Sequence, residues 1–256
     1  MGSLTARALS GIPEVRADDD LAALIVAALD GERLAGGQVV AIAHTVVSKA
    51  EGAVVALAGV EPTPRARELA AEQGGDPRAV QVALEESAEI LRAERGVLIS
   101  RTRHGFVCAN AGVDSSNASS PEELVLLPRD PDASARRLRA RLRELTGSGG
   151  TAVAPAVLIS DSFGRAWRHG QVDVAVGIAG MQPLDDWRGR TDASGLRLRA
   201  TWLAIADAAA AAADLARAKD SREPVVIIEG LERFVTAEDG PGAGALLRPL
   251  EEDLFR

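Results

Sequence analysis

The chain lacks the sequence features that mark several large classes of protein. It has a single cysteine, Cys108, which excludes an intramolecular disulfide and a zinc site built from several cysteines. No apolar run approaches the roughly 18 residues that a membrane-spanning helix needs. No basic segment followed by an apolar run stands near the start, so we expect no secretion signal. A cytoplasmic protein without a membrane partner is the default expectation.

Positive charge is scarce as well. The 256 residues carry a formal net charge of −8, which disfavours a nucleic-acid partner. Lys and Arg together number 29, yet only Lys49 and Lys219 are lysine. An ammonium is a compact point charge that arginine cannot simply replace where space is tight, so a lysine retained among small residues is informative. The alternative is that the two lysines were retained by chance, and this alternative is stronger for Lys219 than for Lys49.

Common catalytic motifs are also missing. The chain has no GxxxxGK[ST] phosphate loop, no GxSxG nucleophile turn and no HExxH zinc motif. Cys108 lies in an apolar stretch, whereas a thiol nucleophile needs a base and an electropositive setting, so we interpret it as a buried structural residue. His44 lies in a predicted strand, where it could belong to the core or to a pocket wall.

Hydrophobic periodicity predicts a mixture of helices and strands. We expect helices at 21–30, 65–73, 77–91, 132–145 and 198–217, and strands at 38–47, 97–103, 106–110, 156–159, 172–178 and 224–229. The arginines of 132–145 are expected mostly on a solvated face. A loop at 147–150 is a candidate boundary between two intertwined subdomains. Regular βαβ alternation is absent, so we expect one mixed α/β (α+β) domain over 1–256 and not a doubly wound Rossmann sheet.

Two segments combine short polar side chains with turn residues. The first is HGFVCANAGVDSSN at 104–117, and the second is ISDSFGRAWRHG at 159–170, about fifty residues on. Segments of this kind fill a core poorly and can hold a ligand close to the main chain. Each offers one carboxylate, and together they predict a split site for a metal ion and its phosphate.

Asp114 and Asp161 are the carboxylates of this predicted site, with the hydroxyl of Ser162 beside them. Such oxygens suit Mg²⁺ or Mn²⁺, and Mg²⁺ takes only one or two protein carboxylates and completes its shell with phosphate oxygens and water. The alternative is that each Asp only forms a turn. Asp161 is expected just past the end of a buried strand.

Cationic and amide side chains near these carboxylates could bind anions. Lys49, at the expected end of a strand, can reach a phosphate with its ammonium. Asn117 can donate to a phosphate or a base, or form an Asx turn instead. Arg165 and Arg168 follow Asp161 closely and are candidates for an anionic substrate.

Long motifs cover nearly the whole chain, from Gly11 to Ile227. They are GIPEV at 11–15, VSKAEG at 47–52, HGFVCANAGVDSSN at 104–117, LLPRDPDASARRLR at 126–139, ISDSFGRAWRHGQVDVAVGIAG at 159–180, RGRTDASGLRL at 188–198 and AIAD at 204–207. In these motifs the chain resembles the coenzyme F420:L-glutamate ligases, also called F420-0:gamma-glutamyl ligases. The resemblance implies the mixed α/β fold particular to that family, without the fused flavin-binding reductase domain that some relatives carry.

The resemblance also implies an activity. It is the GTP-dependent joining of the F420-0 carboxylate to the amine of L-glutamate through an acyl phosphate, followed by further gamma-linked glutamates. A homodimer and two divalent cations, Mg²⁺ or Mn²⁺, are implied, with K⁺ as an additional candidate. Two alternatives stay open: a metal- and GTP-dependent acid–amine ligase for a different substrate, and a nucleotide-binding homologue without catalysis.

Carried over by motif, the resemblance implies roles for individual residues. Asp114, Asp161 and Ser162 would be metal ligands, with Ser162 where the family usually has Thr. The GTP would contact Gly11, Ile12, Pro13, Glu14, His44, Lys49, Asn117 and Lys219. Of these, Lys219 lies in a loop that contacts both nucleotide and metal in the family. Asp114, Asp161 and Lys49 would be the catalytic residues.

Overall fold

A five-stranded sheet forms the centre of the molecule, which the computed structural model describes over residues 2–147 and 154–253. Its strand order is β1-β12-β2-β8-β9. The strands are β1 (Thr5–Leu9), β12 (Val225–Glu229), β2 (Val39–Ala43), β8 (Ala156–Arg165) and β9 (Arg168–Ala179). Of the four neighbouring pairs, only β2 and β8 run parallel. This topology confirms the mixed α/β expectation and is not a doubly wound sheet.

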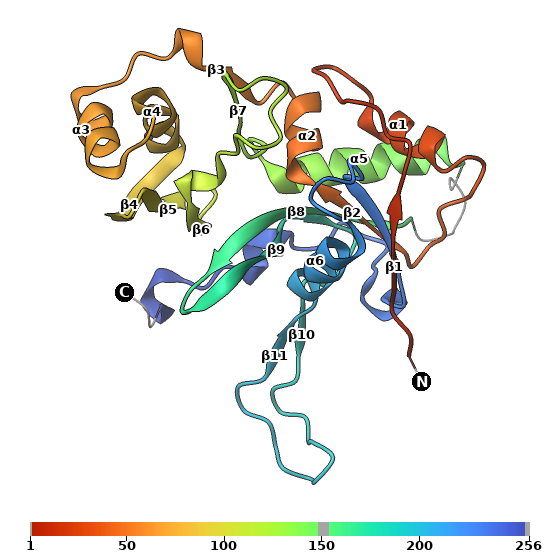
Figure 1. The fold of residues 1–256 in the computed structure, drawn as a ribbon. Helices are drawn as coiled ribbons and strands as arrows, with labels where there is room; N and C mark the ends of the chain where they lie inside the picture. The colour runs from red at the N-terminus through yellow and green to blue at the C-terminus, as the bar shows by residue number, and fades with distance from the viewer. Residues whose placement is uncertain (1, 148–153, 254–256) are drawn as a thin grey trace.

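Helices cover both faces of this sheet (Figure 1). On one face lie α1 (Leu21–Ala28) and α5 (Pro131–Leu145), and on the other lies α6 (Ile205–Ala216). Because side chains alternate along a strand, β2 sends Val40 and Ile42 into the first core and Val39 and Ala41 into the second. A sheet buried on both faces explains why its strands are near-continuous apolar runs.

A smaller lobe, residues 54–125, is inserted between α2 (His44–Ala50) and α5. It contains β3 (Val54–Ala56), η1 (Leu57–Gly59), α3 (Pro64–Gln73), α4 (Pro77–Glu86), β4 (Ser87–Glu94), β5 (Val97–Thr102), β6 (Val107–Ala109), η2 (Asn110–Gly112) and β7 (Glu123–Val125). Small apolar clusters around Leu57 and Leu69 form its interior. The lobe is therefore held by its own packing, and it meets the body where β6 contacts β8 and β7 contacts α2.

The rest of the chain adds a hairpin and short turns. Strands β10 (Leu184–Asp186) and β11 (Trp202–Ala204) pair and extend away from the sheet in Figure 1. The short helices η3 (Glu232–Phe234), η4 (Ala243–Leu246) and η5 (Leu250–Glu252) follow β12. Among the described residues, no helix combines the length and the apolar character needed to cross a membrane.

Several helices and strands begin or end at residues other than those that the sequence predicts. The strand expected at 38–47 stops at Ala43, because the next residues form helix α2, which buries His44, Val47 and Ser48 on one face. That burial outweighs the β propensity of the segment. The helix expected at 198–217 begins only at Ile205, since β11 pairs with β10 before it.

Two further boundaries differ for a related reason. The helix expected at 77–91 ends at Glu86, where Ser87 Oγ bonds Ala83 O at 2.6 Å and the chain enters β4. The strand expected at 156–159 continues to Arg165, because its polar half pairs with β9 in a long hairpin. In both cases pairing with the next strand along the chain, β5 for β4 and β9 for β8, sets the boundary.

The other expected helices and strands are present, with one exception in detail. Arg139 in α5 is buried, with a side chain only 5% exposed, and donates to Pro155 O, Thr236 O and Asp239 Oδ1. The expectation of a solvated face holds for the exposed Arg136, Arg137, Arg141 and Arg143 only. The candidate boundary at 147–150 lies, apart from Gly147, outside the described residues.

Candidate active site

A cleft of about 940 Å³ lies where the sheet body meets the lobe. Its walls come from segments far apart in the sequence, within 12–15, 43–49, 108–119, 160–173 and 217–224. Most of the residues singled out from the sequence line it: Ile12, Pro13, Glu14, His44, Lys49, Asp114, Asn117, Asp161, Ser162 and Lys219. The tertiary structure therefore brings the two predicted halves of the site to one cavity.

Three of the predicted site residues do not line this cleft. Gly11 is exposed in the segment that precedes the cleft-lining Ile12. Arg165 and Arg168 lie at the exposed turn of the β8–β9 hairpin, where Arg165 Nη2 donates to His169 O at 2.6 Å. Their expected roles in nucleotide and substrate binding stay predictions.

The wall that carries Asp114 is a loop, residues 110–119, here called the loop wall. Asn110, Ala111 and Gly112 all have positive φ, which turns the chain sharply after β6. A side chain at Gly112 would bring its Cβ within 2.9 Å of Leu127, so glycine is required there. The backbone of Asp114 then exchanges two hydrogen bonds with Val125 in β7, which anchors the loop.

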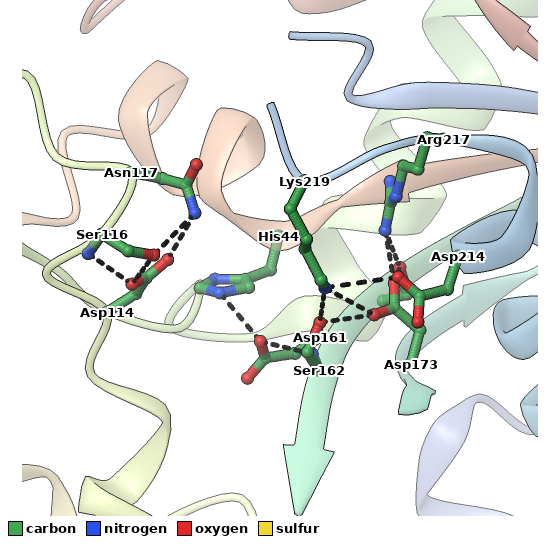
Figure 2. A network of polar contacts seen from close by, with 11 residues as sticks. His44, Asp114, Ser116, Asn117, Asp161, Ser162, Asp173, Asp214, Arg217 and Lys219 are labelled. Atoms are coloured by element: carbon green, nitrogen blue, oxygen red, sulfur yellow. Dashed lines mark hydrogen bonds and ion pairs between the residues drawn. The ribbon is translucent and has the colours of Figure 1, made fainter. Parts of the chain in front are cut away.

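Neighbours in the loop wall hold the Asp114 carboxylate. Ser116 donates to Oδ1 from its backbone N and its Oγ, both at 2.7 Å, and Asn117 Nδ2 donates to Oδ2 at 2.9 Å (Figure 2). Burial alone would raise the pKa of Asp114, but these hydrogen bonds outweigh it and lower the pKa. The carboxylate is therefore ionised and oriented before any ligand binds.

The opposite wall consists of Ser160, Asp161 and Ser162 of β8 with Asp173 of β9, and is here called the strand wall. A register shift follows Ile159 in the pairing of these strands, just where they reach the cleft. Such a shift re-aims side chains at the end of a sheet. Alternation along β8 then places Asp161 on the side of His44, and Ser160 and Ser162 on the side of Asp173.

His44 lies between the two predicted metal carboxylates (Figure 2). Its Nε2 is 3.3 Å from Asp161 Oδ1, and its Nδ1 is buried without a hydrogen-bond partner among the described residues. Burial lowers the pKa of His44, but the surrounding carboxylates, first that of Asp161, outweigh burial and raise it. His44 is the first residue of helix α2 and lines the cleft, so the prediction that it lies in a strand is wrong.

The most buried acid of the cleft, Asp173, was not singled out from the sequence. Its side chain is 1% exposed and accepts hydrogen bonds from Ser160 Oγ at 2.8 Å and Ser162 Oγ at 2.6 Å. Arg217 Nη2 pairs with the same carboxylate and also donates to Ser160 Oγ at 3.0 Å. A carboxylate inside the apolar run QVDVAVGIAG was the available signal, because a buried charge requires a partner.

Lys49 and Lys219 reach the cleft from different elements. Lys49 lies in the last turn of α2, rather than at the end of a strand, and its Nζ bonds Glu14 Oε1 at 2.6 Å. This hydrogen bond is the main reason that the pKa of Glu14 is lowered. Lys219 follows α6 and donates from Nζ to Ser162 Oγ at 2.6 Å. The two retained lysines therefore face one cavity.

The donors of the cleft fit a divalent ion at Asp114 and Asp161. Both are carboxylates with hard oxygens, and Asp161 Oδ2 accepts no hydrogen bond from the described residues. The ion would complete its shell with ligand phosphate and water, since no group of three or more His, Cys, Asp or Glu among the described residues could hold a metal. Ser162 fits a second ion poorly, because its Oγ accepts a hydrogen bond from the Lys219 ammonium, whose positive charge repels a divalent ion.

Cys108 is buried in β6, at the edge of the same cavity. Burial, reinforced by the charge of Asp161, raises the pKa of its thiol to about 12. A thiol with this pKa is protonated at neutral pH and is a poor nucleophile. The structure therefore agrees with its interpretation as a structural residue.

Comparison with known proteins points to a single family. The family model described as F420-0:Gamma-glutamyl ligase matches residues 11–230. Proteins named coenzyme F420:L-glutamate ligase are similar over nearly the full chain. That of Methanothermobacter thermautotrophicus is 45% identical over 97% of both chains, and that of Methanopyrus kandleri is 45% identical over 100% of both. That of Halobacterium salinarum is 40% identical over 97% of this chain and 94% of its own.

Proposed function

The chain belongs to the F420-0:gamma-glutamyl ligase family, and from that premise we propose that it joins L-glutamate to coenzyme F420-0 in a GTP-dependent reaction. One observation carries the proposal. The cleft gathers Asp114, Asp161 and Lys49 from three of the long motifs that the family resemblance rests on. The site therefore has carboxylates suited to a divalent ion on its two facing walls, and an ammonium suited to a phosphate on helix α2.

The proposed chemistry has two steps. The carboxylate of F420-0 attacks the γ-phosphorus of GTP, and GDP leaves as an acyl phosphate forms. The amine of L-glutamate then attacks the acyl carbon, phosphate leaves, and the amine gives up a proton as the amide forms. A carboxylate nucleophile is already ionised at neutral pH and needs no protein base in the first step. This agrees with the lack of a Ser, His or Cys relay among the motifs.

The side chains of the cleft suit these steps. Asp114 and Asp161 would hold the divalent ion, which when bound supplies positive charge against the phosphates. Lys49, oriented by Glu14, presents its ammonium to the same space. Asn117 uses its amide N–H groups on Asp114 Oδ2 and Ser116 Oγ, and its carbonyl oxygen stays available for the nucleotide. Fixed charges of this kind stabilise charge that moves during phosphoryl transfer.

The remaining expectations belong to the same proposal. We propose Mg²⁺ or Mn²⁺ as the divalent metal, with K⁺ as a further cation, a homodimeric state in the cytoplasm, and the addition of more than one glutamate through gamma linkages. Size-exclusion chromatography with light scattering measures the oligomeric state directly. Product tail length is read from the same experiment that tests the activity.

Mass spectrometry of F420-0 incubated with GTP, Mn²⁺ and L-glutamate tests the proposal. We expect product ions separated by one glutamyl residue, together with GDP and phosphate in equal amounts. Reactions without GTP, or with the Asp161→Asn variant, serve as controls and should leave F420-0 unchanged. GTP consumption with another acid but none with F420-0 would indicate a different ligase. GDP binding without product or phosphate would indicate a binding protein.

A further inference from the structure

The ammonium of Lys219 is surrounded by oxygens of the cleft. Its Nζ lies 2.6 Å from Ser162 Oγ, 3.3 Å from Asp214 Oδ1 and 3.9 Å from Asp173 Oδ1 (Figure 2). These groups come from β8, α6 and β9, so the position is defined by three separate elements. A positive charge held among hydroxyl and carboxylate oxygens occupies the kind of environment that a metal cation would take.

The hydrogen bonds around this ammonium leave few oxygens for a second metal ion. Ser162 Oγ donates to Asp173 Oδ1, and the other oxygen of Asp173 receives Ser160 Oγ and the guanidinium of Arg217. A divalent ion at Ser162 would stand beside two fixed positive charges, and their repulsion would oppose its binding. Asp161 lies on the opposite side of β8 and is not engaged by Lys219 or Arg217 in the described contacts.

We propose that the Lys219 ammonium takes the place of one of the two divalent cations that the family resemblance implies, so that the nucleotide-bound cleft holds a single divalent ion, at Asp114 and Asp161. The inference rests on the proposed function, because it concerns the charge that meets the phosphates of GTP. Lys219 acts here as a tethered cation with one positive charge and hydrogen-bond donors. It needs no supply of metal and cannot dissociate.

The exposure of Lys219 supports a role toward a ligand rather than toward the fold. Its side chain is 69% exposed and faces the open cleft, whereas the nearby Arg217 side chain is 10% exposed. Exposed ion pairs contribute little to stability, so the contacts of Lys219 do not hold the fold together. An ammonium has three donors, and a phosphate oxygen in the cleft is an acceptor of the required charge.

Counting bound Mn²⁺ tests the inference without measuring turnover. The protein is dialysed against Mn²⁺ and a non-hydrolysable GTP analogue, and bound manganese per chain is measured by elemental analysis, with free Mn²⁺ followed by electron paramagnetic resonance. We expect one ion per chain in the wild type and two in Lys219→Gln, whose amide oxygen can ligate a metal. Lys219→Arg keeps the positive charge, so its count should stay at one Mn²⁺ ion per chain.

Lys49→Gln is the matched control, because it removes the same charge from the other end of the cleft and should leave the count at one. Circular dichroism checks that each variant is folded. Two ions per chain in the wild type, or a count that stays at one in Lys219→Gln, would overturn the inference while leaving the proposed function intact. A wild type that binds neither nucleotide nor Mn²⁺ would overturn both.

Discussion

The two walls of the cleft differ in how far along the chain their contacts reach. In the loop wall, the Asp114 carboxylate is held by Ser116 and Asn117, two and three residues away. In the strand wall, the Asp173 carboxylate is held by Arg217, 44 residues away, and Ser160, 13 residues away. Local hydrogen bonds can orient a ligand group cheaply, whereas a buried charge in the sheet depends on a partner from another element.

Because of this difference, we expect the loop wall to serve ligand binding and the strand wall to serve the stability of the fold. Residues of the loop wall are mostly exposed or half-buried, so substitutions there should change ligand binding with little effect on the fold. Asp173 and Arg217 in and beside the strand wall are nearly inaccessible to solvent, so substitutions there should change the fold first.

Removing either proposed metal carboxylate should lower activity to the same extent, whether the residue lies in the loop wall or in the strand wall. We expect Asp114→Asn and Asp161→Asn each to lower kcat by about 10³-fold, the effect of losing one electrostatic contact to the reacting phosphate. Thermal unfolding should stay close to that of the wild type. Steady-state assays with saturating Mn²⁺ measure the loss, and a variant that kept wild-type rates would contradict the metal assignment.

Breaking the buried ion pair should unfold the strand wall. Arg217→Met removes the cation in direct contact with the buried Asp173 carboxylate, with the Lys219 ammonium 3.9 Å away as the remaining cation, and should lower the free energy of unfolding by about 3–5 kcal/mol. Urea denaturation measures the change. The double variant Arg217→Met with Asp173→Asn should recover much of the loss, because it removes the unpaired charge. Equal stability of Arg217→Met and the wild type would refute the contrast between the walls.

A substitution in the loop wall should act on binding alone. Asn117→Ala should weaken GDP binding by about tenfold, the consequence of losing a hydrogen bond of roughly 1–1.5 kcal/mol. Its free energy of unfolding should change by less than about 0.5 kcal/mol. Titration with a fluorescent GDP analogue measures the affinity. Ser120→Ala, at the residue that follows the loop wall and does not line the cleft, is the control and should bind normally.

Cys108 should show the smallest effect, visible only at high pH. The pKa of its thiol is about 12 in the folded protein, compared with 9.0 for a thiol that is not buried. The folded chain therefore keeps the proton between these values, and stability should fall as pH rises from about 9 toward 12. Cys108→Ala should lack this decline in urea titrations. Iodoacetamide should label the native thiol slowly at pH 8 and the unfolded thiol readily; rapid native labelling would show that the thiol is not shielded.

Prediction from the sequence succeeded where contacts are local. The HGFVCANAGVDSSN segment is turned by its own positive-φ residues, and its own hydroxyl and amide groups orient Asp114, so its composition already indicated a loop outside the core that lines the cleft. The helix at 132–145 and the strand at 224–229 were also correct, because their periodicity agrees with their burial. The second segment was placed past a strand end, but it forms the outer half of β8 and the turn into β9. The strand predicted at 172–178 lies within β9, and only the pairing register shows that the hairpin extends to Arg165.

The amino-acid sequence by itself determined the mixed fold class, the membership of a family and two of the carboxylates that line the cleft. Periodicity and motif order reside in neighbouring residues, so they can be read along the chain. Only the tertiary structure decided that Asp161 and Ser162 face different sides of β8, that Asp173 is paired with Arg217, and that Lys219 rests on Ser162. Those relations follow from strand register and from packing between distant elements, and no local pattern specifies either.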